Sequence, residues 1–210
     1  MDEAVLTLTE RLADRLCHDF ASSAQAVASG LDLLREAQSP AEREEAESFL
    51  AEAVAAQKTK IRFARQAYGP VAGAVDCAEL ESLIQKLFED IRPDLDWRVR
   101  APTLGPSAAR GLLVLAQLAA DILATGGMAR LDARTEGEVR VVELDADGPR
   151  PVLREEVRSG LTGAPNEATP SGRWAQGAFV WALVKAAGGD VRVEDRPRGV
   201  RVWFSLPKDA

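Results

Sequence analysis

The stretch RLADRLCHDFASSAQAVASGLDLL, residues 11–34, decides the first half of the fold. It lies in a proline-free segment, residues 3–37, whose apolar residues recur at helical spacing. On a helical wheel of roughly 100° per residue, these apolar residues fall within an arc of roughly 80°. They are Val5, Leu12, Leu16, Phe20, Val27, Leu31 and Leu34. The spacing predicts one long amphipathic helix with a single apolar stripe.

A second helix follows after the turn QSP at residues 38–40. Ser39 suits the N-cap of this helix and Pro40 suits its first turn. The helix is expected over about residues 40–67, because Gly69 and Pro70 then stop it. Two long helices joined by a short turn form an antiparallel hairpin. Since such a hairpin buries only one stripe per helix, we expect a second copy of the chain to complete a four-helix bundle.

Beyond residue 70 the composition changes to alternating helical and strand patterns. Helices are expected at 76–91, opened by Asp76 and Glu79, and at 106–125, 151–160 and 174–189. Strands are expected at 96–102, 128–134, 138–146 and, as a final hairpin, within 190–207, and a loop at 161–173. The sequence therefore predicts an α+β fold with a mostly antiparallel sheet covered by helices on one face. The domains are expected at 1–70 and 71–210.

Composition excludes several classes of function. The chain has 210 residues, with 26 basic and 33 acidic side chains and a net charge of −7, which disfavours a general nucleic-acid partner. Its most apolar stretch, residues 111–124, is too short to span a bilayer, and no signal peptide is evident. Cys17, Cys77 and one histidine cannot supply a four-ligand zinc site alone. We expect a cytoplasmic protein with no membrane partner.

The single histidine, His18, is expected on the surface of the first helix. It lies roughly 185° from the centre of the apolar stripe on the wheel. The hairpin places it opposite a basic part of the second helix, where a negatively charged group on the ring would meet cations. These basic residues are Lys58, Lys60, Arg62 and Arg65. Two alternatives stay open: a surface histidine of no consequence, and cations that are simply solvated.

Two segments resemble histidine kinases of two-component systems. The segment LCHDFASSAQAVASGLDLL is similar to the phosphoacceptor H-box, and QGAFVWALVKAAGGDVRVEDRPRGVRVWFSLP, residues 176–207, is similar to the end of a kinase ATP-binding domain. The chain departs from the kinase pattern where nucleotide would bind. The N-box helix has Ala120 and Asp121 but no asparagine, and Pro149 interrupts the G1 box after Asp145, Asp147 and Gly148. In the G2 box only Gly177 stands, followed by Ala178 and Phe179. In the H-box, Asp19 replaces the usual glutamate and no proline follows. We therefore expect a degenerate, kinase-like α/β sandwich.

An H-box reading His-Asp before a degenerate kinase-like domain resembles the ChpT-like histidine phosphotransferases of alphaproteobacterial phosphorelays. The resemblance implies a homodimeric phosphotransferase in which His18 passes a phosphoryl group from the receiver of a hybrid kinase to a response regulator, without ATP. Asp19 would hold the tautomer of His18, or it is a plain surface acid. No cofactor is implied beyond Mg²⁺ supplied by the receiver. The residues expected to dock the receiver are Arg15, Ser22, Gln25, Lys58, Arg62 and Arg65. The alternatives are an ATP-dependent kinase with a divergent pocket and a non-catalytic dimeric regulator that docks receivers.

Overall fold

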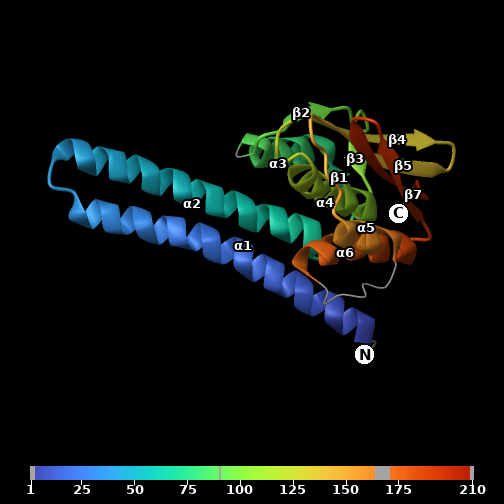
Figure 1. Cartoon of the computed structure of the whole chain (residues 1–210), viewed down its shortest axis with the longest axis horizontal. Coiled ribbons are helices and arrows are strands. Elements are labelled where there is room, and N and C mark those ends of the chain that lie inside the picture. Colours follow the sequence, from blue (N-terminus) through green and yellow to red (C-terminus); the bar gives the residue numbers. More distant parts are fainter. Residues whose placement is uncertain (1–2, 90, 164–170, 209–210) are drawn as a thin grey trace.

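A computed structural model describes residues 3–89, 91–163 and 171–208. Its N-terminal part is a hairpin of two long helices, α1 (Glu3–Glu36) and α2 (Pro40–Tyr68), which extends from the rest of the molecule as an arm (Figure 1). Ser39 caps α2 as predicted, because its hydroxyl accepts from the Glu42 N–H at 3.2 Å and the Glu42 carboxylate accepts from the Ser39 N–H at 3.2 Å. This capping box fixes the point where the chain turns back.

The two helices of the arm approach closely because small residues lie between them. A Cβ on Gly30 of α1 would lie 3.1 Å from the Cα of Leu50 on α2, so this crossing favours glycine. Further small residues, Ser23, Ala46 and Ala53, are buried along the arm. Phe63 and Ala67 of α2 are also buried, and both belong to the main hydrophobic core. The predicted stripe of α1 is only partly covered, since Val5 and Leu31 remain exposed.

The C-terminal part contains a mixed five-stranded sheet in the order β2-β4-β5-β7-β6. The strands are β2 (Asp94–Trp97), β4 (Met128–Glu136), β5 (Val139–Asp147), β6 (Asp190–Arg196) and β7 (Gly199–Pro207). Strand β2 runs parallel to β4, and all other neighbours are antiparallel. Two short strands, β1 (Val75–Asp76) and β3 (Thr103–Leu104), pair separately. The fold class is therefore α+β, as the sequence predicts.

Four helices complete the fold: α3 (Cys77–Glu89), α4 (Pro106–Ile122), α5 (Glu155–Thr162) and α6 (Gly172–Ala186). Helix α4 packs on the sheet so closely that the ring of Phe204 occupies the space where a Cβ on Gly111 would lie. Most of α4 is buried, so it forms the centre of the hydrophobic core. None of the helices in the described ranges has the length and apolarity needed to cross a membrane.

Several element boundaries differ from those expected. The strand predicted at 96–102 lies at 94–97, because pairing with β4 stops after the Arg98 N–H donates to the Leu131 carbonyl at 2.8 Å. The helix predicted at 151–160 begins only at Glu155, since the Val152 N–H donates to the Ile122 carbonyl and keeps that segment extended. Helix α6 begins at Gly172, capped by Ser171, and residues 164–170 of the predicted loop lie outside the described residues.

Candidate functional site: an exposed histidine beside a cleft

His18 lies midway along α1 with its imidazole in solvent. Its side chain is 81% exposed, as the position opposite the apolar stripe predicts. Ser22 and Gln25, one and two turns further along the same face, are also exposed. A reacting group on another protein can therefore reach the ring without any movement of this chain.

Asp19 forms a hydrogen bond with the histidine ring. Its Oδ1 atom lies 3.3 Å from Nδ1 of His18. Because an ionised carboxylate only accepts hydrogen bonds, this contact requires a ring proton on Nδ1, and in the neutral imidazole the lone pair is then on Nε2. In that tautomer Nε2 is the ring nitrogen that carries no proton.

Arg15 in turn holds Asp19. Its Nε atom donates to Oδ2 of Asp19 at 3.1 Å. Burial would lower the pKa of the Arg15 guanidinium, but the charge and hydrogen bond of Asp19 outweigh it and keep that pKa above its usual value. Gly172 at the start of α6 lies against the Arg15 stem, since a Cβ there would be 3.0 Å from the Arg15 Cβ. The C-terminal half of the chain thus contacts the side chain that positions Asp19.

A cleft of about 440 Å³ opens beside Asp19, between the arm and helices α3 and α4. Lys60 of α2 and Lys86 of α3 stand on its walls, and Asp121 of α4 contributes a carboxylate whose Oδ2 atom is buried without a hydrogen bond. Its apolar lining consists of Leu16, Phe20, Phe63, Leu87 and Ile91, together with the alanines of the facing helices. The cleft therefore combines an apolar floor with charges of both signs near the histidine.

The predicted cations of α2 divide between two surfaces. Lys60 lines the cleft beside Asp19, whereas Lys58, Arg62 and Arg65 line a separate hollow of about 600 Å³. The structure therefore does not bring these three together with His18 in one cavity. Sequence reasoning did not single out Lys86, because nothing local in α3 indicates that this residue faces α1 and α2.

The base of the arm is joined to the C-terminal half by a hydrogen-bonded and aromatic contact. The Tyr68 hydroxyl donates to Oε1 of Gln117 at 2.6 Å, and Nε2 of Gln176 donates to the same atom at 3.3 Å. The Tyr68 ring meets Phe179 edge-on at 5.1 Å, and the Arg110 guanidinium lies 5.0 Å from the Phe179 centroid. Burial raises the pKa of Tyr68 to about 12, so the phenol stays a donor. The contact fixes the arm against α4 and α6.

The residues at the kinase nucleotide-box positions are engaged within the fold. A Cβ on Gly177 would lie 2.5 Å from the Val157 carbonyl oxygen, so this glycine serves the packing of α6 on α5. Asp145 is ion-paired with Arg196 at 3.0 Å. Phe179 is held between Tyr68 and Arg110. Across the described parts of the chain, no three His, Cys, Asp or Glu side chains cluster as metal ligands.

An exposed histidine on a helical hairpin, followed by this mixed sheet with helices on one face, defines the class of histidine kinases and histidine phosphotransferases. The chain belongs to the family described as "Histidine phosphotransferase C-terminal domain", whose model matches residues 77–199. It is also similar to protein phosphotransferase ChpT of Brucella abortus (strain 2308), with 26% identity over 137 residues. That alignment covers 64% of this chain and 63% of the relative, so the chain matches less than two thirds of that protein.

Solved structures show the same fold. A bacterial phosphotransferase superimposes with a TM-score of 0.83, covering 97% of this chain and 98% of its own, at 19% identity. The catalytic domain of the histidine kinase ThkA superimposes with a TM-score of 0.50, covering 65% of this chain and 95% of its own, at 18% identity. The fold is therefore that of a phosphotransferase along nearly the whole chain and that of a kinase catalytic domain over part of it.

Proposed function

We propose that this chain relays a phosphoryl group between receiver-domain aspartates through Nε2 of His18, without using ATP. Membership of the histidine phosphotransferase family supports phosphoryl transfer in general. The observation that carries the specific proposal is the solvent-exposed His18 ring with Nδ1 held by Asp19 at 3.3 Å. We assign the transfer function to residues 1–70 and a packing and docking function to residues 71–210, and we place the protein in the cytoplasm.

The chemistry balances without a further reactant. The Nε2 lone pair attacks the phosphorus of a receiver aspartyl phosphate, the N–P bond forms, and the P–O bond breaks with its electron pair returning to the aspartate. The ring keeps its Nδ1 proton and becomes a phosphoimidazolium, whose positive charge Asp19 stabilises. In the second half, the carboxylate of another receiver attacks the phosphorus and the neutral imidazole is released.

The receiver would supply the remaining parts of the site. It brings Mg²⁺ and its own acidic residues, while this chain presents His18 and a docking face around it. Ser22 and Gln25 remain the docking candidates beside the ring, because both are exposed on the same face. Arg15 is engaged with Asp19 and therefore acts as a positioning residue in this proposal. Lys58, Arg62 and Arg65 form a second candidate contact in their own hollow.

Packing supports the part of the proposal that excludes ATP. Three residues at positions where the kinase boxes would bind nucleotide make internal contacts instead. Gly177 packs on α5, and Phe179 lies between Tyr68 and Arg110. Asp145 pairs with Arg196. A nucleotide would have to displace these contacts. The alternative of an ATP-dependent kinase with a divergent pocket is tested below.

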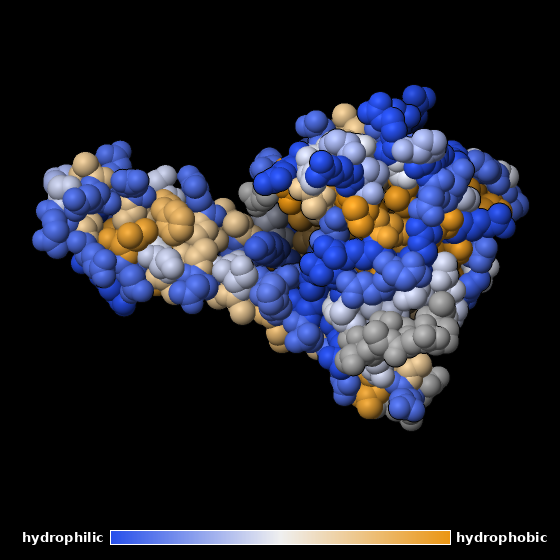
Figure 2. All heavy atoms as spheres, in the orientation of Figure 1, coloured by the Kyte–Doolittle hydropathy of each residue, from blue (hydrophilic) through white to orange (hydrophobic). Residues whose placement is uncertain are grey.

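We further propose that two copies of the chain pair through the arm to form a four-helix bundle. Apolar side chains are exposed on the arm, as Figure 2 shows for one of its faces. Leu33 is 50% exposed and Phe49 is 41% exposed, and both line a hollow of about 360 Å³ near the arm's end. Exposed large apolar side chains that share one surface are typical of a protein interface.

Phosphoryl transfer from receiver and from nucleotide distinguishes the candidate functions. The purified chain is incubated with a ³²P-phosphorylated receiver domain in one experiment and with γ-³²P ATP in a second experiment. Acid-labile label on the chain is measured in both. We expect label from the receiver alone, absent in His18→Ala and reduced in Asp19→Asn. Asp14→Asn, which removes an exposed carboxylate on the same helix, is the matched control and should transfer as the wild type does.

Two results would contradict the proposal. Label that arrives from ATP and is lost in His18→Ala would establish an autophosphorylating kinase. Binding of receivers with no label on the chain, unchanged by His18→Ala, would establish a non-catalytic docking regulator.

A further inference from the structure

One edge of strand β4 is open over its second half. Strand β5 pairs with β4 along its whole length, from Met128 to Glu136, but β2 pairs only with residues 128–131. The last bond on the β2 side is donated by the Arg98 N–H to the Leu131 carbonyl. Because backbone groups alternate in direction along a strand, Ala133 and Thr135 point their N–H and C=O groups to this same side. Ala133 is only 3% exposed, whereas Thr135 is exposed, so Thr135 is the accessible part of this unpaired edge. No backbone group of the described residues bonds to them there.

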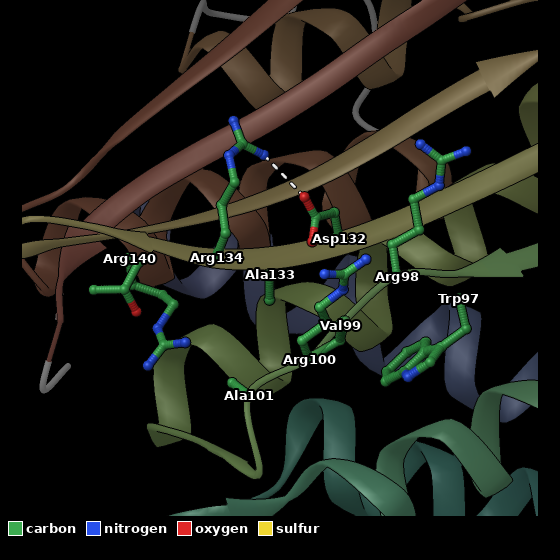
Figure 3. Close-up of a pocket in the computed structure, with 10 residues that line it drawn as sticks. Trp97, Arg98, Val99, Arg100, Ala101, Asp132, Ala133, Arg134 and Arg140 are labelled. Atoms are coloured by element: carbon green, nitrogen blue, oxygen red, sulfur yellow. Dashed lines mark hydrogen bonds and ion pairs between the residues drawn. The ribbon is translucent and has the colours of Figure 1, made fainter.

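The open edge borders a groove of about 710 Å³. One wall is the segment that leaves β2, residues 97–101, and the other is β4 from Asp132 to Thr135 with Arg140 of β5. Figure 3 shows Ala133 between the guanidinium groups of Arg100 and Arg140, while the heads of Arg98 and Arg134 lie on the opposite side of β4. The small side chains of Val99, Ala101 and Ala133 also line the groove.

Two of the four arginines in this groove keep an uncompensated charge. Arg98 is paired with Asp96 at 2.7 Å, and Arg134 is bound by Asp132, Glu136 and Glu143. Within the described ranges, Arg100 and Arg140 form no ion pair, and Nε of Arg140 is buried without a hydrogen bond. A buried donor without a partner is unfavourable, so an acceptor at this position would be bound favourably. In a chain of net charge −7, this cationic groove is a local exception.

We propose that this groove binds an acidic peptide segment of another protein in extended conformation, which adds as a strand to the open edge of β4. The N–H and C=O groups of the exposed Thr135 would continue the ladder, and Arg100 and Arg140 would bind carboxylates of the peptide. A small anion would use the arginines but not the strand edge, and the open edge between them favours a peptide. The site shares no residue with the proposed phosphotransfer site.

Fluorescence anisotropy with a defined probe tests this site. The probe is a short fluorescein-labelled peptide in which glutamate alternates with valine. We expect saturable binding to the full chain, and binding roughly tenfold or more weaker for the double variant Arg100→Gln/Arg140→Gln. The double variant Arg43→Gln/Arg198→Gln removes the same charge from exposed positions far along the chain and should bind as the wild type does. His18→Ala should also bind normally, so failure of either proposal can be recognised separately.

The backbone contribution is tested independently of charge. A probe N-methylated at alternate residues, made in both registers, should lose binding, and Thr135→Pro should weaken the unmodified probe because the edge loses a donor. Hydrogen exchange of the Thr135 amide should slow when the probe is bound. Equal binding of the N-methylated probe, equal binding by the Arg100/Arg140 double variant, or no binding at all would overturn the proposal. If the groove bound pyrophosphate but not the peptide, it would be a small-anion site. If the chain self-associated and Thr135→Pro abolished that association, the edge would be an interface between copies of the chain. Either result would overturn the proposal.

Discussion

The arm and the C-terminal half of this chain are stabilised in different ways. Helix α1 has 34 residues, of which only Ser23 and Gly30 are buried, whereas most of the 17 residues of α4 are buried. The arm depends on close contact between small residues, and the C-terminal half has a large apolar core between sheet and helices. The proposed reactive histidine lies on the region that has the least core of its own.

The difference indicates that the accessible histidine and the well-packed hydrophobic core lie in separate regions of the chain. A side chain that must reach into another protein is best placed on a surface with few internal contacts, and a long helix offers such a surface with a rigid backbone. The joint at Tyr68, Gln117 and Gln176 then anchors the arm to the well-packed half. Equivalent substitutions in the two regions measure how much each region contributes to the stability of the fold and to phosphoryl transfer.

The largest expected effect comes from a phenylalanine-to-alanine change made in each region. Phe204 is fully buried and fills the space against Gly111, so Phe204→Ala should lower the free energy of unfolding by about 3–5 kcal/mol. Phe49 on the arm is 41% exposed, so Phe49→Ala should cost the monomer less than about 1 kcal/mol. Urea denaturation measures both values. Equal losses would show that the arm has a core as strong as that of the C-terminal half.

Alkaline pH should weaken the joint between the two regions. An unfolded tyrosine ionises near pH 10, whereas burial raises the pKa of Tyr68 to about 12. Between these values the unfolded chain loses its proton first, so stability is complete below about pH 10 and falls by up to about 2–3 kcal/mol as pH rises through 12. Tyr68 is the one tyrosine of the sequence, so tyrosinate absorbance reports its titration directly. Tyr68→Phe should remove this part of the pH dependence; a titration near pH 10 in the folded protein would contradict the buried joint.

The smallest expected effect concerns the positioning of Asp19 by Arg15. In Arg15→Gln a partly exposed ion pair is lost, which should cost about 0.5–1 kcal/mol of stability and slow phosphoryl transfer from a receiver about twofold to fivefold. Arg35→Gln removes a more exposed pair with Asp32 on the same helix and should change neither quantity. Thermal denaturation measures the change in stability, and phosphoryl-transfer assays quenched at set times measure the change in transfer rate. Equal stability and equal transfer rates in the two variants would contradict a positioning role for Arg15.

Much of the fold could be predicted because its signals are local. The turn with Ser39 and Pro40, the wheel position of His18 and the β4–β5 hairpin around Gly137 each depend on neighbours in sequence. The end of β2 depends instead on where parallel pairing with β4 stops, and a periodic pattern does not encode that partner. For the same reason the sequence does not show that Lys60 and Lys58 line different hollows. A helical wheel gives the angle of a residue on α2 but not the positions of α3 and α4 around that helix.

Gly177 has a consequence for protein engineering. Its missing side chain admits the Val157 carbonyl of α5, so in the function proposed above this position packs two helices together instead of holding a phosphate. Restoring glycines around Gly177 would leave α5 where it is. If the chain uses no ATP, as proposed, an engineer who wished to add a nucleotide pocket at Gly177 would have to move helix α5 before changing any residue of the pocket itself.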